Sequence, residues 1–171
     1  MATAEDLRAE FTEFMRANNV KFTIHNEADN IVKLEFAARP SKGKGADTTV
    51  LVDFDERGDE ADSVHFVAWE FASCTEANYA QVLVKLNDYN RKYRWCKFWM
   101  KKTDNGGVIT ADADAKLVPG SSGLEVTGLA FTVSDIVEDV IIDLGDLVDA
   151  GGSGPSMDDI LALLKMLADR S

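Results

Sequence analysis

The alternation of apolar and polar residues divides the first half of the chain into one helix and four strands. Over residues 3–18, apolar side chains recur every three or four positions, which predicts an amphipathic helix. Four short runs follow that alternate or are rich in β-branched and aromatic residues, at 20–25, 31–37, 49–54 and 64–71. Nothing between them is long enough for a crossover helix, so the pattern predicts an antiparallel meander.

The second half of the chain predicts two helices around a further hairpin. A stripe of apolar and tyrosine side chains at helical spacing predicts a helix over 75–93. Two strands, 95–102 and 108–116, are separated by an Asn-Gly pair, a strong hairpin signal because both residues tolerate positive φ. A long helix over 123–148 has a wide apolar side and an acidic side opposite.

The predicted fold class is α+β, an antiparallel sheet with helices mainly on one face, in the order α-ββββ-α-ββ-α plus a C-terminal helix. Residues 1–149 form the predicted domain and the glycine-rich residues 150–156 a linker. Residues 157–169 form an amphipathic helix with Ile160 and Leu164 on its apolar side. Such a short helix is marginal alone, so it is expected to dock on its own domain, a twin subunit or another protein.

Composition narrows the class of protein. The 171 residues include 18 Lys and Arg against 30 Asp and Glu, a net charge of −12, which argues against a general binder of nucleic acid or anionic membranes. No apolar stretch is long enough to span a membrane, and the acidic N-terminus does not resemble a signal peptide. A soluble cytoplasmic protein with both cysteines reduced is expected.

The charge is unevenly distributed along the chain. Residues 85–102 hold seven bases against one acid, a net charge of +6, whereas residues 103–171 hold three bases against 13 acids, a net charge of −10. This basic segment contains two of the three tryptophans of the chain. The combination points to a contact surface, because aromatic and basic residues are enriched at interfaces.

Strand alternation places the members of this contact surface. Over residues 95–102 it puts Trp95, Lys97, Trp99 and Lys101 on one side. Cys96 then shares the core-facing side with its apolar neighbours. The alternative is that a helix covers both tryptophan rings inside the protein.

The sequence holds no complete metal, phosphate or catalytic motif. The acidic run that begins at Asp53 has Arg57 and Val64 where a calcium loop needs oxygen ligands, so an acidic turn is predicted. Gly43-Lys44-Gly45 lacks the spacing of a phosphate loop. His25 and His65 have no metal-ligand partners at a recurrent spacing. We therefore predict no catalytic residue, no cofactor and no metal.

One enzymatic or ligand-binding alternative stays open. Asp112 and Asp114 alternate with alanines on one strand face and could form a close carboxylate pair. A small-ligand binder or enzyme would place them in a pocket between the sheet and the helix over 123–148. A solvated strand face is the simpler interpretation, because a spacing of two is ordinary on strands.

Residues 86–98, Leu-Asn-Asp-Tyr-Asn-Arg-Lys-Tyr-Arg-Trp-Cys-Lys-Phe, and the strand Val-Ile-Thr-Ala-Asp-Ala-Asp at 108–114 resemble the YbjN family. The resemblance is firmest over residues 75–145. It implies a bacterial cytoplasmic α+β domain similar to type III secretion chaperones, which are small, acidic, often dimeric and bind proteins without catalysis. Within the motif, Asn87 and Asn90 are expected to bond carbonyls freed at a helix end, as a fold signature.

These observations predict a non-enzymatic protein-binding module, chaperone-like or regulatory. Its partner is expected to be another protein or a second copy of the chain, as in a homodimer, and not nucleic acid or a membrane. The candidate partner-binding residues are Trp95, Lys97, Trp99, Lys101, Ile160 and Leu164.

Overall fold

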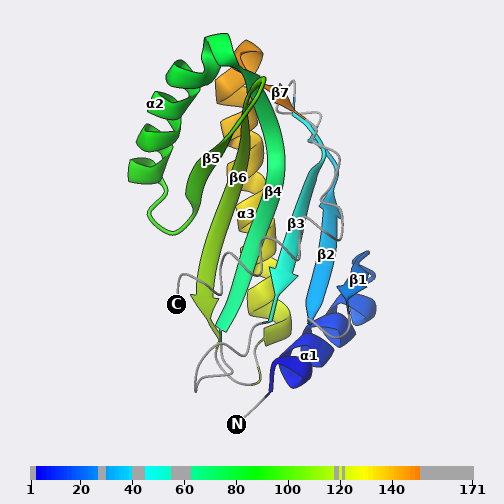
Figure 1. Ribbon diagram of the computed structural model, residues 1–171. Coiled ribbons are helices and arrows are strands. Elements are labelled where there is room, and N and C mark those ends of the chain that lie inside the picture. The colour runs from blue at the N-terminus through cyan, green and yellow to red at the C-terminus, as the bar shows by residue number, and fades with distance from the viewer. Residues whose placement is uncertain are drawn as a thin grey trace.

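The computed structural model is an antiparallel sheet with three α-helices on one of its faces (Figure 1). The predicted α+β class and the placement of the helices are confirmed. The structure describes residues 3–26, 30–39, 45–54, 63–117, 120 and 122–150. Its elements are α1 (Ala4–Ala17), β1 (Thr23–Asn26), β2 (Ile31–Phe36), β3 (Thr48–Asp53), β4 (Ser63–Thr75), α2 (Glu76–Lys92), β5 (Lys97–Thr103), β6 (Gly106–Lys116), α3 (Ser122–Leu144), the 3-10 turn η2 (Gly145–Leu147) and β7 (Asp149–Ala150).

The strands are ordered β1-β2-β3-β4-β6-β5, so β1 and β5 lie at the two edges. The long strand β4 pairs with β3 and then, after an irregularity between Ala68 and Ala72, with β7. Glu70 lies within this irregularity and has a positive φ of 43°. A bulge of this kind bends a strand and lets it change partner.

Local signals explain how α1 begins and ends. Thr3 Oγ1 accepts from the Asp6 N–H at 3.1 Å, and Asp6 Oδ2 accepts from the Thr3 N–H at 2.9 Å, which is a capping box. At the other end Asn19 takes a positive φ of 55°, and the Val20 N–H donates to the Met15 carbonyl. This helix-ending turn occupies the residues just after α1, so β1 begins at Thr23 and not at residue 20.

The end of the described chain also differs from expectation. The helix predicted to reach residue 148 ends at Leu144, because Gly145 adopts a positive φ of 53° and opens a 3-10 turn. Ala150, predicted to begin a linker, pairs with Ala72 of β4 as part of β7. The remainder of the predicted linker and the predicted helix over 157–169 lie outside the described residues.

The main core lies between the sheet and the helices. In Figure 1, α3 passes behind the sheet, and its small apolar side chains Val126, Ala130, Val133 and Val137 are fully buried there. α1 approaches α3 so closely that a Cβ on Gly123 would lie 2.5 Å from the Cβ of Phe14. Apolar side chains therefore fill the space where the alternative function would place a pocket.

A second, smaller cluster lies on the other face of the sheet, which faces the viewer in Figure 1. We call this the helix-free face, since α1, α2 and α3 all pack against the main core on the opposite side. Its buried members are Ile31, Leu51 and Val67, with Trp69 and Trp99 packed around them. No described helix is long and apolar enough to cross a membrane.

Candidate binding surface

The end of α2 is joined to the edge strand β5 by one side chain. Asn90 Nδ2 donates to the Phe98 carbonyl at 2.8 Å, and the Phe98 N–H donates to Asn90 Oδ1 at 2.7 Å. We expected Asn90 to bond carbonyls at the end of its own helix, but its partner is the strand. The amide satisfies the two backbone groups that Phe98 turns away from β6, so this part of the motif has a structural role.

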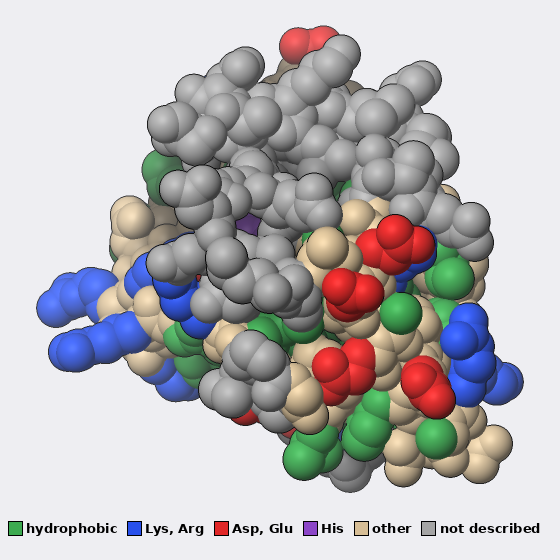
Figure 2. Space-filling view, turned by 90° about the horizontal axis from the view of Figure 1, so that it is seen from below, with side chains coloured by type: hydrophobic (Ala, Val, Ile, Leu, Met, Phe, Trp, Pro, Cys, Tyr) green, Lys and Arg blue, Asp and Glu red, His purple; other side chains and the backbone are tan. Residues whose placement is uncertain are grey.

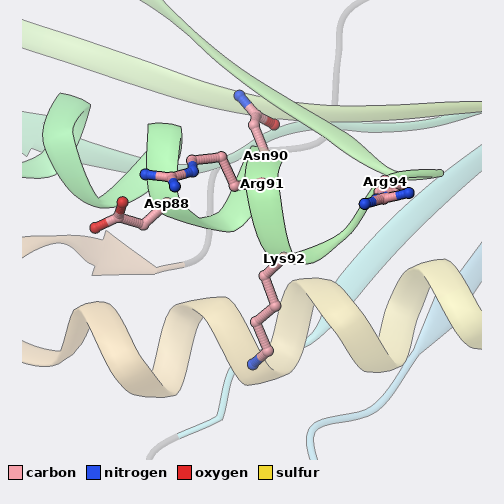
Figure 3. Close-up of a pocket in the computed structure, with 5 residues that line it drawn as sticks. All are labelled: Asp88, Asn90, Arg91, Lys92 and Arg94. Carbon is pink, nitrogen blue, oxygen red and sulfur yellow. The ribbon is translucent and has the colours of Figure 1, made fainter.

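A set of basic side chains surrounds this junction, and we call it the basic turn: Arg91, Lys92, Arg94 and Lys97. Arg91, Lys92 and Arg94 line an open hollow of about 680 Å³ together with Asp88 and Asn90. Figure 3 shows that the lining side chains diverge: Lys92 extends toward α3, whereas Asn90 points toward the strands. Such divergence does not suit a small molecule, which needs polar groups that converge.

The positive charge of the basic turn is only partly offset by contacts with neighbouring groups. Lys97 Nζ donates to the Asn90 carbonyl at 3.1 Å, and Lys92 lies 4.7 Å from the Tyr93 ring centroid. Arg91 and Arg94 make no ion pair with any described residue, and both are exposed. Some of this charge offsets the carbonyl end of α2, which favours cations.

Lysines continue along β5 beside a tryptophan. Lys97, Trp99 and Lys101 share one side of the strand, and both lysines are exposed. Lys101, like Arg91 and Arg94, has no ion-pair partner in the described part of the chain. In Figure 2, long basic side chains project on the left, and other basic side chains lie on the right beside acidic ones. Acids of the following segment lie beside this basic segment: Lys85 Nζ is 3.4 Å from Asp143 Oδ2, and Lys97 is the cross-strand neighbour of Asp112.

Trp99 and Trp95 lie on different faces of the sheet, so the prediction that they share one side is wrong. Trp99 packs against Trp69 on the helix-free face, edge to face at a centroid distance of 6.1 Å. Trp95 packs against Phe66 of the main core at 6.0 Å, and its Nε1 donates to the Asp114 carbonyl at 2.6 Å. The cause is a bend over residues 94–96, which interrupts the alternation before β5 begins.

Asp112 and Asp114 do share a strand face, but it is the helix-free face. Ala111 precedes Asp112, and Ala113 lies between the two acids. Both alanines belong to the main core. Asp114 Oδ1 lies 2.5 Å from His65 Nδ1, and the Asp114 side chain is 77% exposed. The two acids therefore cannot line a pocket between the sheet and α3, which removes the geometric basis of the alternative function.

The pairing of His65 with Asp114 was not predicted. His65 lies in the central strand β4 and is buried. Its Nε2 atom has no hydrogen-bond partner among the described residues. The two residues are 49 positions apart and meet through the register of β4 and β6. Sequence spacing could not reveal this pair, since that register is set by tertiary structure.

Contacts between α2 and α3 hold the basic turn in place. The Tyr89 hydroxyl donates to Asp143 Oδ2, and Lys85 Nζ lies 3.4 Å from the same carboxylate. The Tyr89 hydrogen bond, followed by the charge of Lys85, lowers the pKa of Asp143, despite an opposing effect of burial. Burial, followed by the bond to Asp143, raises the pKa of Tyr89.

Both cysteines are free and buried. Burial, with a smaller effect of the Asp112 charge, raises the pKa of the Cys96 thiol to about 12, and burial also raises that of Cys74. Neither thiol is a nucleophile at neutral pH in this state, because the thiolate is the reactive form. The described residues contain no cluster of three or more His, Cys, Asp or Glu side chains able to hold a metal ion.

Ile160 and Leu164, the other two predicted partner-binding residues, lie outside the described residues. The structure therefore brings together Lys97, Trp99 and Lys101 of the predicted set and separates Trp95 from them. The structure adds Arg91 and Arg94 of the basic turn to the candidate binding surface.

Comparison with known proteins identifies the fold. No protein-family model matches the chain, and no curated protein matches it. Among solved structures, it is similar to the crystal structure of YbjN from E. coli, a proposed transcription regulator, with a TM-score of 0.57 and 12% sequence identity. The match covers 86% of this chain and 96% of YbjN. The chain therefore has a YbjN-like fold, whereas family membership and the resemblance to secretion chaperones stay predictions.

Proposed function

We propose that this protein is a non-catalytic binding module that docks an acidic segment of a protein partner on the basic turn and the adjacent lysines of β5. The observation that carries the proposal is a group of exposed cations without ion-pair partners in the described chain, Arg91, Arg94 and Lys101. They lie in a protein whose net charge is −12.

Charge complementarity gives this surface a way to select its partner. Arginine presents a planar fork of donors that binds a carboxylate through two parallel hydrogen bonds. A local positive potential also steers an acidic segment to this end of the molecule, while the overall negative charge repels the same segment elsewhere.

The contact at Asn90 favours recognition by side chains over strand addition. A partner segment that extends a sheet needs free backbone groups along the edge strand. At β5 the outward groups of Phe98 are already bonded to Asn90. An acidic segment would therefore lie against the exposed basic side chains.

Three further observations support a role without catalysis. The side chains at the hollow diverge, both thiols have raised pKa values, and the space between the sheet and α3 is filled by apolar side chains. The description of YbjN as a proposed transcription regulator is also compatible with a regulatory binding role.

The test is the affinity for a fluorescein-labelled, glutamate-rich peptide, measured by fluorescence anisotropy at low and high salt. Replacement of Arg91, Arg94 and Lys101 by Glu should weaken binding about tenfold or more, since exposed ion pairs contribute modestly and add together. The matched control is Lys21→Glu, an exposed lysine that precedes β1 and should leave affinity unchanged. Equal affinity in the triple variant, or tighter binding of single-stranded DNA by the unmodified protein, would contradict the proposal.

A further inference from the structure

We propose that residues 157–169 dock, within the same chain, on the helix-free face of the sheet, over Ile31, Leu51 and Val67. This inference does not depend on the proposed function, because it concerns the apolar centre of the face and not the basic turn.

The first argument is burial. Ile31 and Leu51 are 2% exposed and Val67 is 3% exposed, although α1, α2 and α3 all lie on the opposite face. His65, which points to the same face as Val67, is 7% exposed. Side chains on an uncovered sheet stand away from its plane and keep their outer ends in water. Burial to this degree requires a further layer of chain.

The second argument is composition. The covering layer must bring apolar side chains, because burying polar groups against an apolar cluster costs free energy. Outside the described residues, the segment 55–62 has Ala61 as its single apolar residue, and the segment 40–44 has none beyond Pro40. The remaining short segments offer few apolar side chains, whereas the last 21 residues of the chain carry a large set: Met157, Ile160, Leu161, Leu163, Leu164, Met166 and Leu167.

The third argument is reach. The described chain ends at Ala150, which pairs with Ala72, five positions along β4 from Val67. That distance is about 17 Å at the usual rise per strand residue. The six residues 151–156 can span up to about 20 Å. The connection is therefore long enough to bring residue 157 to the cluster.

The fourth argument is size. A helix over residues 157–169 would be about 20 Å long. The cluster extends from Ile31 on β2 to Trp99 on β5, four strand spacings apart, which is about 19 Å. By helical spacing, Ile160, Leu161, Leu164 and Leu167 fall on one side. The length and the apolar side of such a helix both fit the cluster.

The experiment uses the full chain with Trp95→Phe, so that Trp69 and Trp99 on the helix-free face are the reporters. In this background, Leu161→Asp with Leu164→Asp should shift tryptophan emission to longer wavelength and increase quenching by acrylamide. The control is Ala162→Asp, which adds one carboxylate on the opposite side of the predicted helix and should change neither signal. Unchanged emission and quenching in the double variant would overturn the proposal.

Two additional measurements keep the test decisive. If circular dichroism shows that the double variant loses its fold, Leu164→Ala must give the same change in a folded protein, and no change would count against docking. Sedimentation equilibrium of the unmodified chain should give a monomer at the concentrations used for fluorescence. A dimer whose dissociation exposes the tryptophans would show docking between two copies and overturn docking within one chain. The peptide affinity of the basic turn is measured separately, so either proposal can fail alone.

Discussion

Asn90 bonds both backbone groups of Phe98 through its side-chain amide, at 2.8 and 2.7 Å. This pair joins the last turn of α2 to the edge strand eight residues later. It also explains why an asparagine stands at this position, since the site needs one donor and one acceptor in one planar group.

Replacement of Asn90 by Ala should lower the free energy of unfolding by about 1–3 kcal/mol, because it leaves a partly buried N–H and carbonyl unsatisfied. Urea denaturation followed by circular dichroism measures the change. The matched control is Asn87→Ala on the exposed side of the same helix, where we expect a change within about 0.5 kcal/mol. Equal effects of the two substitutions would contradict the assigned role of Asn90.

Two glycines of α3 should respond in opposite directions to alanine. At Gly128 nothing lies within 4 Å of an added Cβ, so Gly128→Ala should stabilise by about 1 kcal/mol through helix propensity. At Gly123 the added Cβ would lie 2.5 Å from the Phe14 Cβ, so Gly123→Ala should destabilise by roughly 1–3 kcal/mol. Thermal unfolding of both variants tests the close contact of α1 with α3, and a stabilised Gly123→Ala variant would show that the contact is absent.

The Tyr89–Asp143 contact should make stability depend on pH in the acid range. The folded-state pKa of Asp143 is lowered, so its contribution is present above about pH 4 and is lost as pH falls through the folded-state value. Tyr89→Phe should remove part of that dependence and reduce stability at neutral pH. Tyr79→Phe makes the same chemical change at the other end of α2 and is the control; denaturation at a series of pH values distinguishes them. Parallel curves for Tyr89→Phe and the unmodified protein would be inconsistent with this contact.

The buried thiols should not react with a thiol reagent while the protein is folded. Because Cys74 and Cys96 are buried and their pKa values are raised, a thiol-reactive dye at pH 8 should label neither until the protein unfolds. The rate of labelling then follows opening of the core. Rapid modification of either cysteine without loss of circular dichroism signal would show that the surrounding packing is looser than described.

Local patterns predicted most of the elements. The Asn-Gly turn before β6 depends on neighbouring residues, so the sequence shows it directly. The Lys97, Trp99 and Lys101 side of β5 follows from alternation alone and lies where it was predicted. Trp95 was misplaced because a bend at residues 94–96 interrupts the same alternation.

Contacts between distant residues could not be predicted. The pairing of His65 with Asp114, the bond of Tyr89 to Asp143 and the return of Ala150 to β4 each join residues more than 45 positions apart. Their partners are selected by sheet register and helix packing, neither of which is encoded in a short window. The basic turn was visible as charge, but its hollow and its junction with Phe98 required the structure.

The central pairing of the sheet has a consequence for the speed of folding. β4 and β6 are neighbours, yet α2 and β5 lie between them in the chain, so their register joins Ser63 to Lys116 and Thr75 to Gly106. Closing such long loops costs entropy before the new contacts compensate for it. The hairpin of β5 and β6 can form early, whereas the sheet is complete only when β4 meets β6. Folding should therefore be slower than in a helical bundle of equal length, with this strand pair formed at or after the rate-limiting step.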